Sequence, residues 1–371
     1  MILVTLLACG GGDKVAVPDD SDAADTDVDT DTDTDTDTDT DTDADTDVWT
    51  GWGACTDAAE CDDGLACSDN QCVDGRCITV PVNDCGWPAS DVESLAAGRQ
   101  VLHDQLSGAD YDPALGRLWL VRRDYIIRMT EDGPGDWVID TVGGQPAVWQ
   151  VNDDIEGITV FDPARPDSVL VCTDGDDTVD EYDLSGVNPV KVRTYNTAPF
   201  IQGGQGYDGS EGITFVPDAD LAAWNFTDPD GIPVVSANGM GGLVLVAHQT
   251  GGSIYAFDLD PNSANGDLVG RYQSARSESA GLDFDASTGR LYIFHGDSFN
   301  DLEVARLSTS PAGNARKFDT EYIWDRPANL NTEGVAVAPI DTCNAGARSL
   351  WLASDDEAEQ SLLWFKDWGC F

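Results

Sequence analysis

The chain has 371 residues, of which 41% are hydrophobic, and its formal net charge is −50. This length and hydrophobic content allow one large domain, or two ordinary ones, with a packed core. The charge argues against nucleic acid as a partner, because proteins bind a polyanion by displacing its counterions with Lys and Arg. It also argues against electrostatic docking on anionic lipid and favours cations as charged partners.

The first nine residues are predicted to be a lipoprotein signal segment. The run Leu6-Leu7-Ala8-Cys9 matches the bacterial lipobox, which implies that Cys9 becomes the lipidated N-terminus. Only eight residues precede Cys9 and none is basic, so we expect the true start of translation to lie upstream. Glycines follow Cys9 where an Asp often retains lipoproteins at the inner membrane, so we expect the outer membrane or cell surface. The lipid would be the only membrane anchor.

Two segments separate Cys9 from the main domain. Residues 10–50 are predicted to be a disordered acidic tether, because residues 25–47 are almost pure Thr-Asp alternation with no apolar face. A calcium-binding repeat array is the alternative, but such arrays need Gly at fixed turns, and this alternation contains none. Residues 51–88 are predicted to be a disulfide-rich module whose pairing stays open, built on Cys55, Cys61, Cys67, Cys72, Cys77 and Cys85. A zinc site would need C-x₂-C spacing or His, and the segment has neither.

A short phrase recurs through residues 90–371. Its glycines are Gly108, Gly157, Gly212, Gly281 and Gly334, and three of the five copies read Glu-Gly. Each copy opens an apolar alternating run, followed by a turn rich in Asp, Pro or Gly and then by two further strand-like runs. A repeat of about 50 residues made of short antiparallel strands is typical of a β-propeller. The sequence therefore predicts an all-β propeller over residues 90–371.

The spacing of the copies predicts five blades. The 69-residue step between the third and fourth copies leaves a sixth blade open, because it contains the insertion 219–236. Only 37 residues follow Gly334, so we expect the residues around Gln100–His103 to complete the last blade. Cys343 and Cys370 are expected to pair in this blade, and Cys172 is expected to be a buried free thiol.

The ordered series S-G-A-D-Y-D-P, D-I-E-G-I, S-E-G-I-T-F, S-A-G-L-D-F-D and N-T-E-G-V-A-V resembles the SdiA-regulated family of bacterial propellers. It is more distantly similar to phytase-like and esterase-like propeller domains. The resemblance implies an extracytoplasmic propeller with divalent metal at the channel mouth, and it does not fix a reaction.

The first strand of each blade lines the channel of a propeller, so residues that begin these strands are expected to converge at one mouth. Carboxylates there repel one another unless a cation neutralises them, and calcium suits oxygen ligands. The predicted calcium ligands are Glu156, Glu211, Glu333 and Asp174. The predicted ligand-binding residues are Ser107 at a strand start and four residues at second-strand ends, namely Arg122, His248, His295 and Asp355. As the alternative, each Glu caps a strand start or pairs with Arg.

Three functions follow from this reading. The leading one is a lipid-anchored envelope protein, expected to be a monomer, whose propeller binds a small molecule or surface protein, with calcium as a cofactor. The second is a calcium-dependent ester or phosphoester hydrolase of phytase-like or lactonase-like type. The third is a structural surface protein. No nucleophile elbow, zinc-protease motif or P-loop is found.

Overall fold

The computed structural model describes the chain in the ranges 56–57, 68–73, 76–81, 86–103, 105–201, 209–296, 299–313, 315–326, 331–355 and 359–370. Cys9, the tether 10–50 and the cysteines Cys55, Cys61, Cys67 and Cys85 lie outside these residues. In the Cys-rich segment, β1 (Ser68–Val73) pairs with β2 (Arg76–Pro81) as an antiparallel hairpin. Cys72 of β1 is disulfide-bonded. No helix in the described part of the chain is long and apolar enough to cross a membrane.

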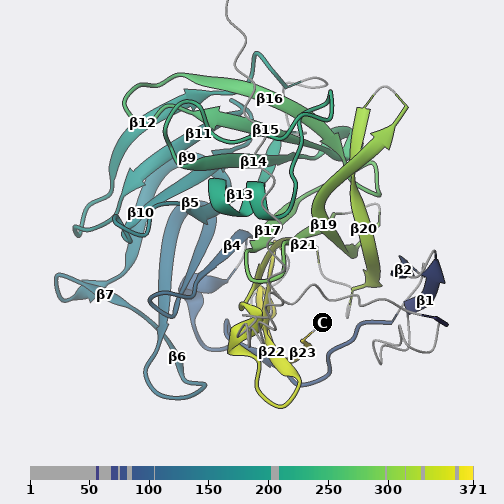
Figure 1. Ribbon diagram of the computed structural model, residues 1–371. Helices are drawn as coiled ribbons and strands as arrows, with labels where there is room; N and C mark the ends of the chain where they lie inside the picture. Colours follow the sequence, from purple (N-terminus) through teal and green to yellow (C-terminus); the bar gives the residue numbers. More distant parts are fainter. Residues whose placement is uncertain are drawn as a thin grey trace, which may run out of the picture. The chain divides into compact units, whose positions relative to one another are not determined.

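The regular secondary structure of the rest of the described chain is almost entirely β-strand (Figure 1). The first half holds β3 (Val92–Ser94), β4 (Leu106–Asp112), β5 (Arg117–Glu131), β6 (Trp137–Ile139), β7 (Thr141–Val142), β8 (Gln145–Pro146), β9 (Val148–Val160), β10 (Ser168–Thr173), β11 (Thr178–Asp183) and β12 (Val190–Asn196). The second half holds β13 (Ser210–Pro217), β14 (Gly242–His248), β15 (Ser253–Leu259), β16 (Gly266–Gln273), β17 (Gly281–Asp285), β18 (Arg290–His295), β19 (Asp301–Ala312), β20 (Ala315–Asp325), β21 (Thr332–Val337), β22 (Ala347–Ser354) and β23 (Leu362–Gly369). The described α-helix is α1 (Asp218–Ala223), in the predicted insertion.

The strands form consecutive antiparallel groups. The second group runs β9-β10-β11-β12, the third β13-β14-β15-β16, the fourth β17-β18-β19-β20 and the last β21-β22-β23-β3. A short parallel pairing of β16 with β20 joins the third and fourth groups into one eight-stranded sheet. In the first group β4 pairs with β5, which also pairs with β6 and with the beginning of β9. β9 therefore starts in the first group and continues as the first strand of the second.

Burial changes from the inside of a group to its edge. β10 reads SVLVCT and all six residues are buried, because groups pack against both of its faces. The outer strand β12 reads VKVRTYN and buries only Tyr195. Because the second strands are buried on both faces, they appear in the sequence as continuous apolar runs.

The five strands that carry the repeated glycines form a closed ring. A Cβ placed on Gly108 would lie 2.6 Å from the carbonyl oxygen of Glu156, and one on Gly212 would lie 2.4 Å from that of Ala280. One on Gly334 would lie 2.8 Å from the Cα of Gly108, so the last copy meets the first. Glycine is required because the inner strands approach too closely for any side chain. Gly212 meets the Ala280–Leu282 segment directly, and no other described strand lies between them.

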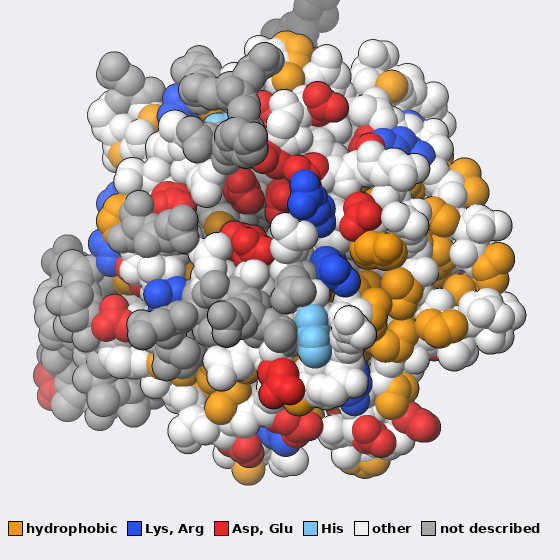
Figure 2. Space-filling view, turned by 180° about the vertical axis from the view of Figure 1, so that it is seen from behind, with side chains coloured by type: hydrophobic (Ala, Val, Ile, Leu, Met, Phe, Trp, Pro, Cys, Tyr) orange, Lys and Arg blue, Asp and Glu red, His pale blue; other side chains and the backbone are white. Residues whose placement is uncertain are grey.

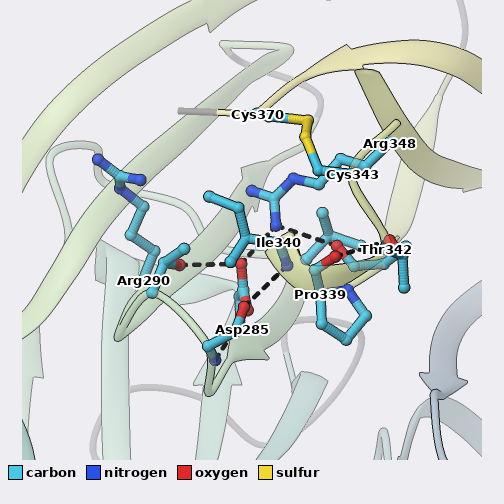
Figure 3. Close-up of polar contacts among 12 residues, drawn as sticks. Asp285, Arg290, Pro339, Ile340, Thr342, Cys343, Arg348 and Cys370 are labelled. Atoms are coloured by element: carbon cyan, nitrogen blue, oxygen red, sulfur yellow. Dashed lines mark hydrogen bonds and ion pairs between the residues drawn. A yellow bond between two sulfur atoms is a disulfide. The ribbon is translucent and has the colours of Figure 1, made fainter. Parts of the chain in front are cut away.

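The last group is completed by residues from before the first one. β3 pairs with β23, with Ser94 opposite Leu363 and Val92 opposite Phe365. The prediction that Gln100–His103 supplies this strand was wrong, since Gln100–Leu102 is a 3₁₀ turn that buries Leu102. The residues that do pair with β23 come earlier in the chain, in β3. This strand is short and mostly exposed at the edge of the sheet, so its sequence shows no clear apolar pattern. The predicted Cys343–Cys370 disulfide is present in this group (Figure 3), and Cys172 is a buried free thiol.

Candidate functional site

The three glutamates of the repeated phrase lie at the same end of the ring of inner strands. Glu156, Glu211 and Glu333 each precede a ring glycine, in β9, β13 and β21. We call this end of the ring the mouth. Figure 2 shows a face on which acidic side chains gather around a hollow at the centre. The repeat places these carboxylates together because the inner strands enter the ring in the same direction.

Glu211 is the most deeply placed carboxyl group of the mouth. Its residue is 9% exposed, and burial raises the pKa of its carboxyl well above the usual value. The negative charges of Glu156 and Glu333 add to this rise in pKa, followed by those of Asp174 and Glu278. Among the described residues none donates a hydrogen bond to this carboxylate. Glu211 is therefore a buried acid surrounded by acids.

Glu156 interacts with three further residues that were predicted as site residues from the sequence, namely Ser107, Asp174 and Asp355. The pKa of its carboxyl is raised to about 7, mainly by burial and also by the charges of Asp154, Asp174 and Asp355, while a hydrogen bond from Ser107 acts to lower it. Asp174 and Asp355 come directly after the second strands of the second and last groups. Second-strand ends thus reach the same mouth as first-strand starts, which is what an antiparallel pairing requires.

Glu333 has a different environment from the other two glutamates. It is half-buried and accepts a hydrogen bond from Asn331 Nδ2 at 2.9 Å. The negative charge of Glu333 raises the pKa of Glu211, while the side-chain amide of Asn331 donates a hydrogen bond to the carboxylate of Glu333 itself. The three glutamates are therefore related by the repeat without being chemically alike.

The two predicted histidines are held inside their own strand groups. His295 is fully buried, with Nδ1 2.5 Å from the carbonyl oxygen of Glu278 and Nε2 3.0 Å from Glu303 Oε2. A carbonyl can only accept, so Nδ1 carries a proton. His248 is also fully buried; its Nδ1 accepts from the backbone N–H of Thr250 at 3.2 Å, and its Nε2 has no partner among the described atoms.

Arg122 lies beside the first strand group and not over the acidic centre. Its Nη1 donates to the carbonyl oxygen of Val101 at 3.3 Å, and its guanidinium lies 5.6 Å from the ring centre of Tyr125. The adjacent Arg123 pairs with Asp154 at 3.5 Å, and both residues line an open hollow of about 450 Å³. A positively charged group therefore stands at the edge of the mouth.

Sequence reasoning missed Glu278 in the fourth copy. That copy reads Ser279-Ala280-Gly281, so a fixed spacing from the glycine found no acid there. Glu278 lies three residues before the glycine instead of one, is 9% exposed, and adds to the rise in the pKa of Glu211. A search for any Glu within three residues before each repeated glycine would have found it.

In the described part of the chain, no three His, Cys, Asp or Glu side chains come close enough together to hold one ion. Glu156, Glu211, Glu333 and Asp174 thus share one electrostatic environment but do not form a ready coordination shell. The calcium site stays a prediction from the sequence.

No protein-family model matches the chain, and no curated protein matches it. Among solved structures, the chain is similar to glutaminyl cyclase from Myxococcus xanthus at a TM-score of 0.44 and 12% sequence identity, covering 75% of this chain and 94% of that one.

Proposed function

We propose that this protein is a five-bladed β-propeller that binds, without chemical conversion, a ligand presenting a positively charged group to the mouth. The observation that carries the proposal is Glu211, a buried carboxyl that faces Glu156 and Glu333 and has no hydrogen-bond donor among the described residues. Like charges in a poorly solvated place are costly unless a cation joins them. A bound cation would offset that cost and let the glutamates ionise.

Two kinds of ligand supply this chemistry. One is a calcium ion, as the sequence suggests, and the other is an organic cation with an ammonium group. The separation of the acidic side chains favours an ammonium group or a hydrated ion over a bare ion bound by three side chains. An ammonium group donates three hydrogen bonds and can reach several carboxylates through them.

The test is calorimetric titration of the full-length protein with calcium chloride, and separately with putrescine, at pH 7. The variants are Glu156→Gln and Glu211→Gln, and the matched control is Glu93→Gln, an exposed acid paired with Lys366. We expect one of the two cations to bind the wild type and the control, with at least tenfold weaker binding to both mouth variants. Binding should also release protons, because the cation lowers the raised pKa of Glu156.

Equal affinities in wild type and both mouth variants would overturn the proposal, as would failure of both cations to bind. The second result would leave the structural alternative, in which the glutamates only shape strand starts. Calcium-dependent cleavage of a phenyl ester or phenyl phosphate, abolished by chelation and by Glu211→Gln, would instead favour the hydrolase alternative.

The location is a separate proposal that rests on the sequence alone. We propose that Cys9 is lipidated and that the acidic tether spaces the propeller from the outer membrane. Metabolic labelling with palmitate in a bacterial host, wild type beside Cys9→Ser, tests it. Label that persists in the Cys9→Ser variant would contradict the lipid anchor.

A further inference from the structure

A second cavity opens at the opposite end of the inner strands. We call it the cup. Its volume is about 490 Å³, within the range of small-molecule sites. Its walls are largely apolar and include the rings of Tyr111, Phe161, Phe215 and Phe284. These side chains follow the ring glycines by three or four residues, so four of the five inner strands each contribute one ring.

Two buried acids lie among the residues that line the cup. Asp110 and Asp283 are 7% and 5% exposed and occupy the same position in their strands, two residues after Gly108 and Gly281. Each uses one oxygen to accept the backbone N–H of the next inner strand, from Val160 and from Val337, both at 2.6 Å. The corresponding residues of the other inner strands are uncharged, namely Thr159, Thr214 and Ala336.

All charged side chains that line the cup are carboxylates. Two at the rim are already neutralised, because Asp285 pairs with Arg348 and Asp162 pairs with Arg165 (Figure 3 shows the former). No Lys or Arg in the described part of the chain forms an ion pair with Asp110 or Asp283. Burial raises the pKa of Asp110 to about 6 and that of Asp283 well above its usual range, and the charge of Asp110 contributes to the second rise. No cationic side chain of the described residues therefore balances the charge of this pair when either carboxyl ionises.

We propose that the cup binds a small apolar amine as its ammonium ion, with the nitrogen at Asp110 and Asp283 and the apolar body against the aromatic walls. Aromatic faces attract cations, and a carboxylate in an apolar surrounding forms strong charge-assisted hydrogen bonds with an ammonium group. A neutral apolar ligand would leave the charge of the pair unbalanced, and an anion would be repelled by it. The proposal does not depend on the mouth, because the ring of glycines between the two ends encloses only about 10 Å³, roughly the space of one water.

The test is calorimetric titration of the full-length protein with 2-phenylethylammonium and with 2-phenylethanol, which has the same carbon skeleton without the charge. We expect the ammonium to bind at least about tenfold more tightly than the alcohol. Asp110→Asn/Asp283→Asn should remove that preference, because Asn keeps an oxygen for the backbone N–H but loses the charge. Phe215→Ala should weaken binding of both probes. Glu93→Gln, an exposed acid paired with Lys366 and outside the lining of the cup, is the matched control and should change neither. Glu211→Gln, at the mouth, reports any ammonium that binds there instead.

Equal affinity for the two probes in the wild type would overturn the proposal, as would an unchanged ammonium preference in the double Asn variant. Loss of ammonium binding in Glu211→Gln alone would move the site to the mouth and overturn it as well. So would the absence of saturable ammonium binding up to about 10 mM. Urea unfolding of each variant verifies that its fold is intact.

Discussion

Arg348 and Asp285 form an ion pair with no exposed side-chain surface, Nη1 lying 2.5 Å from Oδ2 (Figure 3). The pair joins the second strand of the last group to the first turn of the fourth group. Arg348 also donates to the carbonyl oxygen of Ala338 at 3.0 Å and to the hydroxyl of Tyr292 at 2.5 Å. One guanidinium thus holds together the neighbourhood of the disulfide and the rim of the cup.

Arg348→Met should lower the free energy of unfolding by about 3–5 kcal/mol, because Asp285 would remain buried without its partner. Adding Asp285→Asn should restore part of the loss, since the unbalanced charge disappears. Urea unfolding measures both. Glu93→Gln is the comparison: its ion pair with Lys366 is exposed, and its loss should cost less than about 1 kcal/mol. A loss for Arg348→Met as small as that of Glu93→Gln would contradict the role of the pair.

Gly212→Ala should lower the free energy of unfolding by more than about 2 kcal/mol, because the added methyl would meet the backbone of the neighbouring inner strand at 2.4 Å. The three nearest atoms all belong to the backbone of residues 280–282, so no flexible side chain can move aside. Gly86→Ala is the control, since a Cβ there meets nothing within 4 Å, and it should stay within about 0.5 kcal/mol. Equal thermal midpoints for the two variants would show that the inner strands can separate.

Glu156→Gln should stabilise the protein at pH 8 and have little effect at pH 4. The pKa of Glu156 is raised in the folded state from 4.5 to about 7, so its ionisation opposes folding. Its favourable contribution is fully present below pH 4.5 and is lost as the pH rises through 7. We expect a gain on the order of 1–3 kcal/mol at pH 8. Urea unfolding from pH 4 to 8 measures it, with the exposed Glu359→Gln as control; a gain that does not depend on pH would exclude ionisation as its cause.

Cys370→Ala should lower the free energy of unfolding by about 2–4 kcal/mol, because the disulfide closes a loop with a sequence separation of 27 residues. Cys343→Ala should give a similar loss. The double variant should be as stable as the less stable of the two single variants, because both changes remove the same disulfide bond. Additive losses would mean that the two side chains contribute separately, through packing. Calorimetric melting of the three variants distinguishes these results.

The repeated glycines were the part of the fold that the sequence specified best. A glycine is needed wherever two inner strands meet. The glycines therefore recur at regular intervals in the sequence, and counting them gives the number of inner strands. The missing strand of the last group could not be placed in the same way. β3 has three residues on an edge, and its position depends on pairing with Leu363, which lies about 270 residues away in the chain.

The two ends of the inner strands differed in how much could be predicted. The glutamates of the mouth recur before the glycines, so their convergence followed from the repeat. The cup depends on Asp110 and Asp283, which stand in the two copies that lack Glu-Gly. Their importance comes from burial among aromatic rings of other strands, and burial of that kind is a property of the assembled ring.

The pairing of β3 with β23 makes the two ends of the repeated region partners in one sheet. A chain emerging from a ribosome or crossing a membrane presents β3 first and β23 last, so the ring stays open until nearly all of the domain is available. Until then β4 and β21, the inner strands that meet at Gly108 and Gly334, have no partner across the closure. Contacts this far apart in the chain slow folding. We therefore expect the late step of folding to be ring closure, with the Cys343–Cys370 bond forming beside the closing strands.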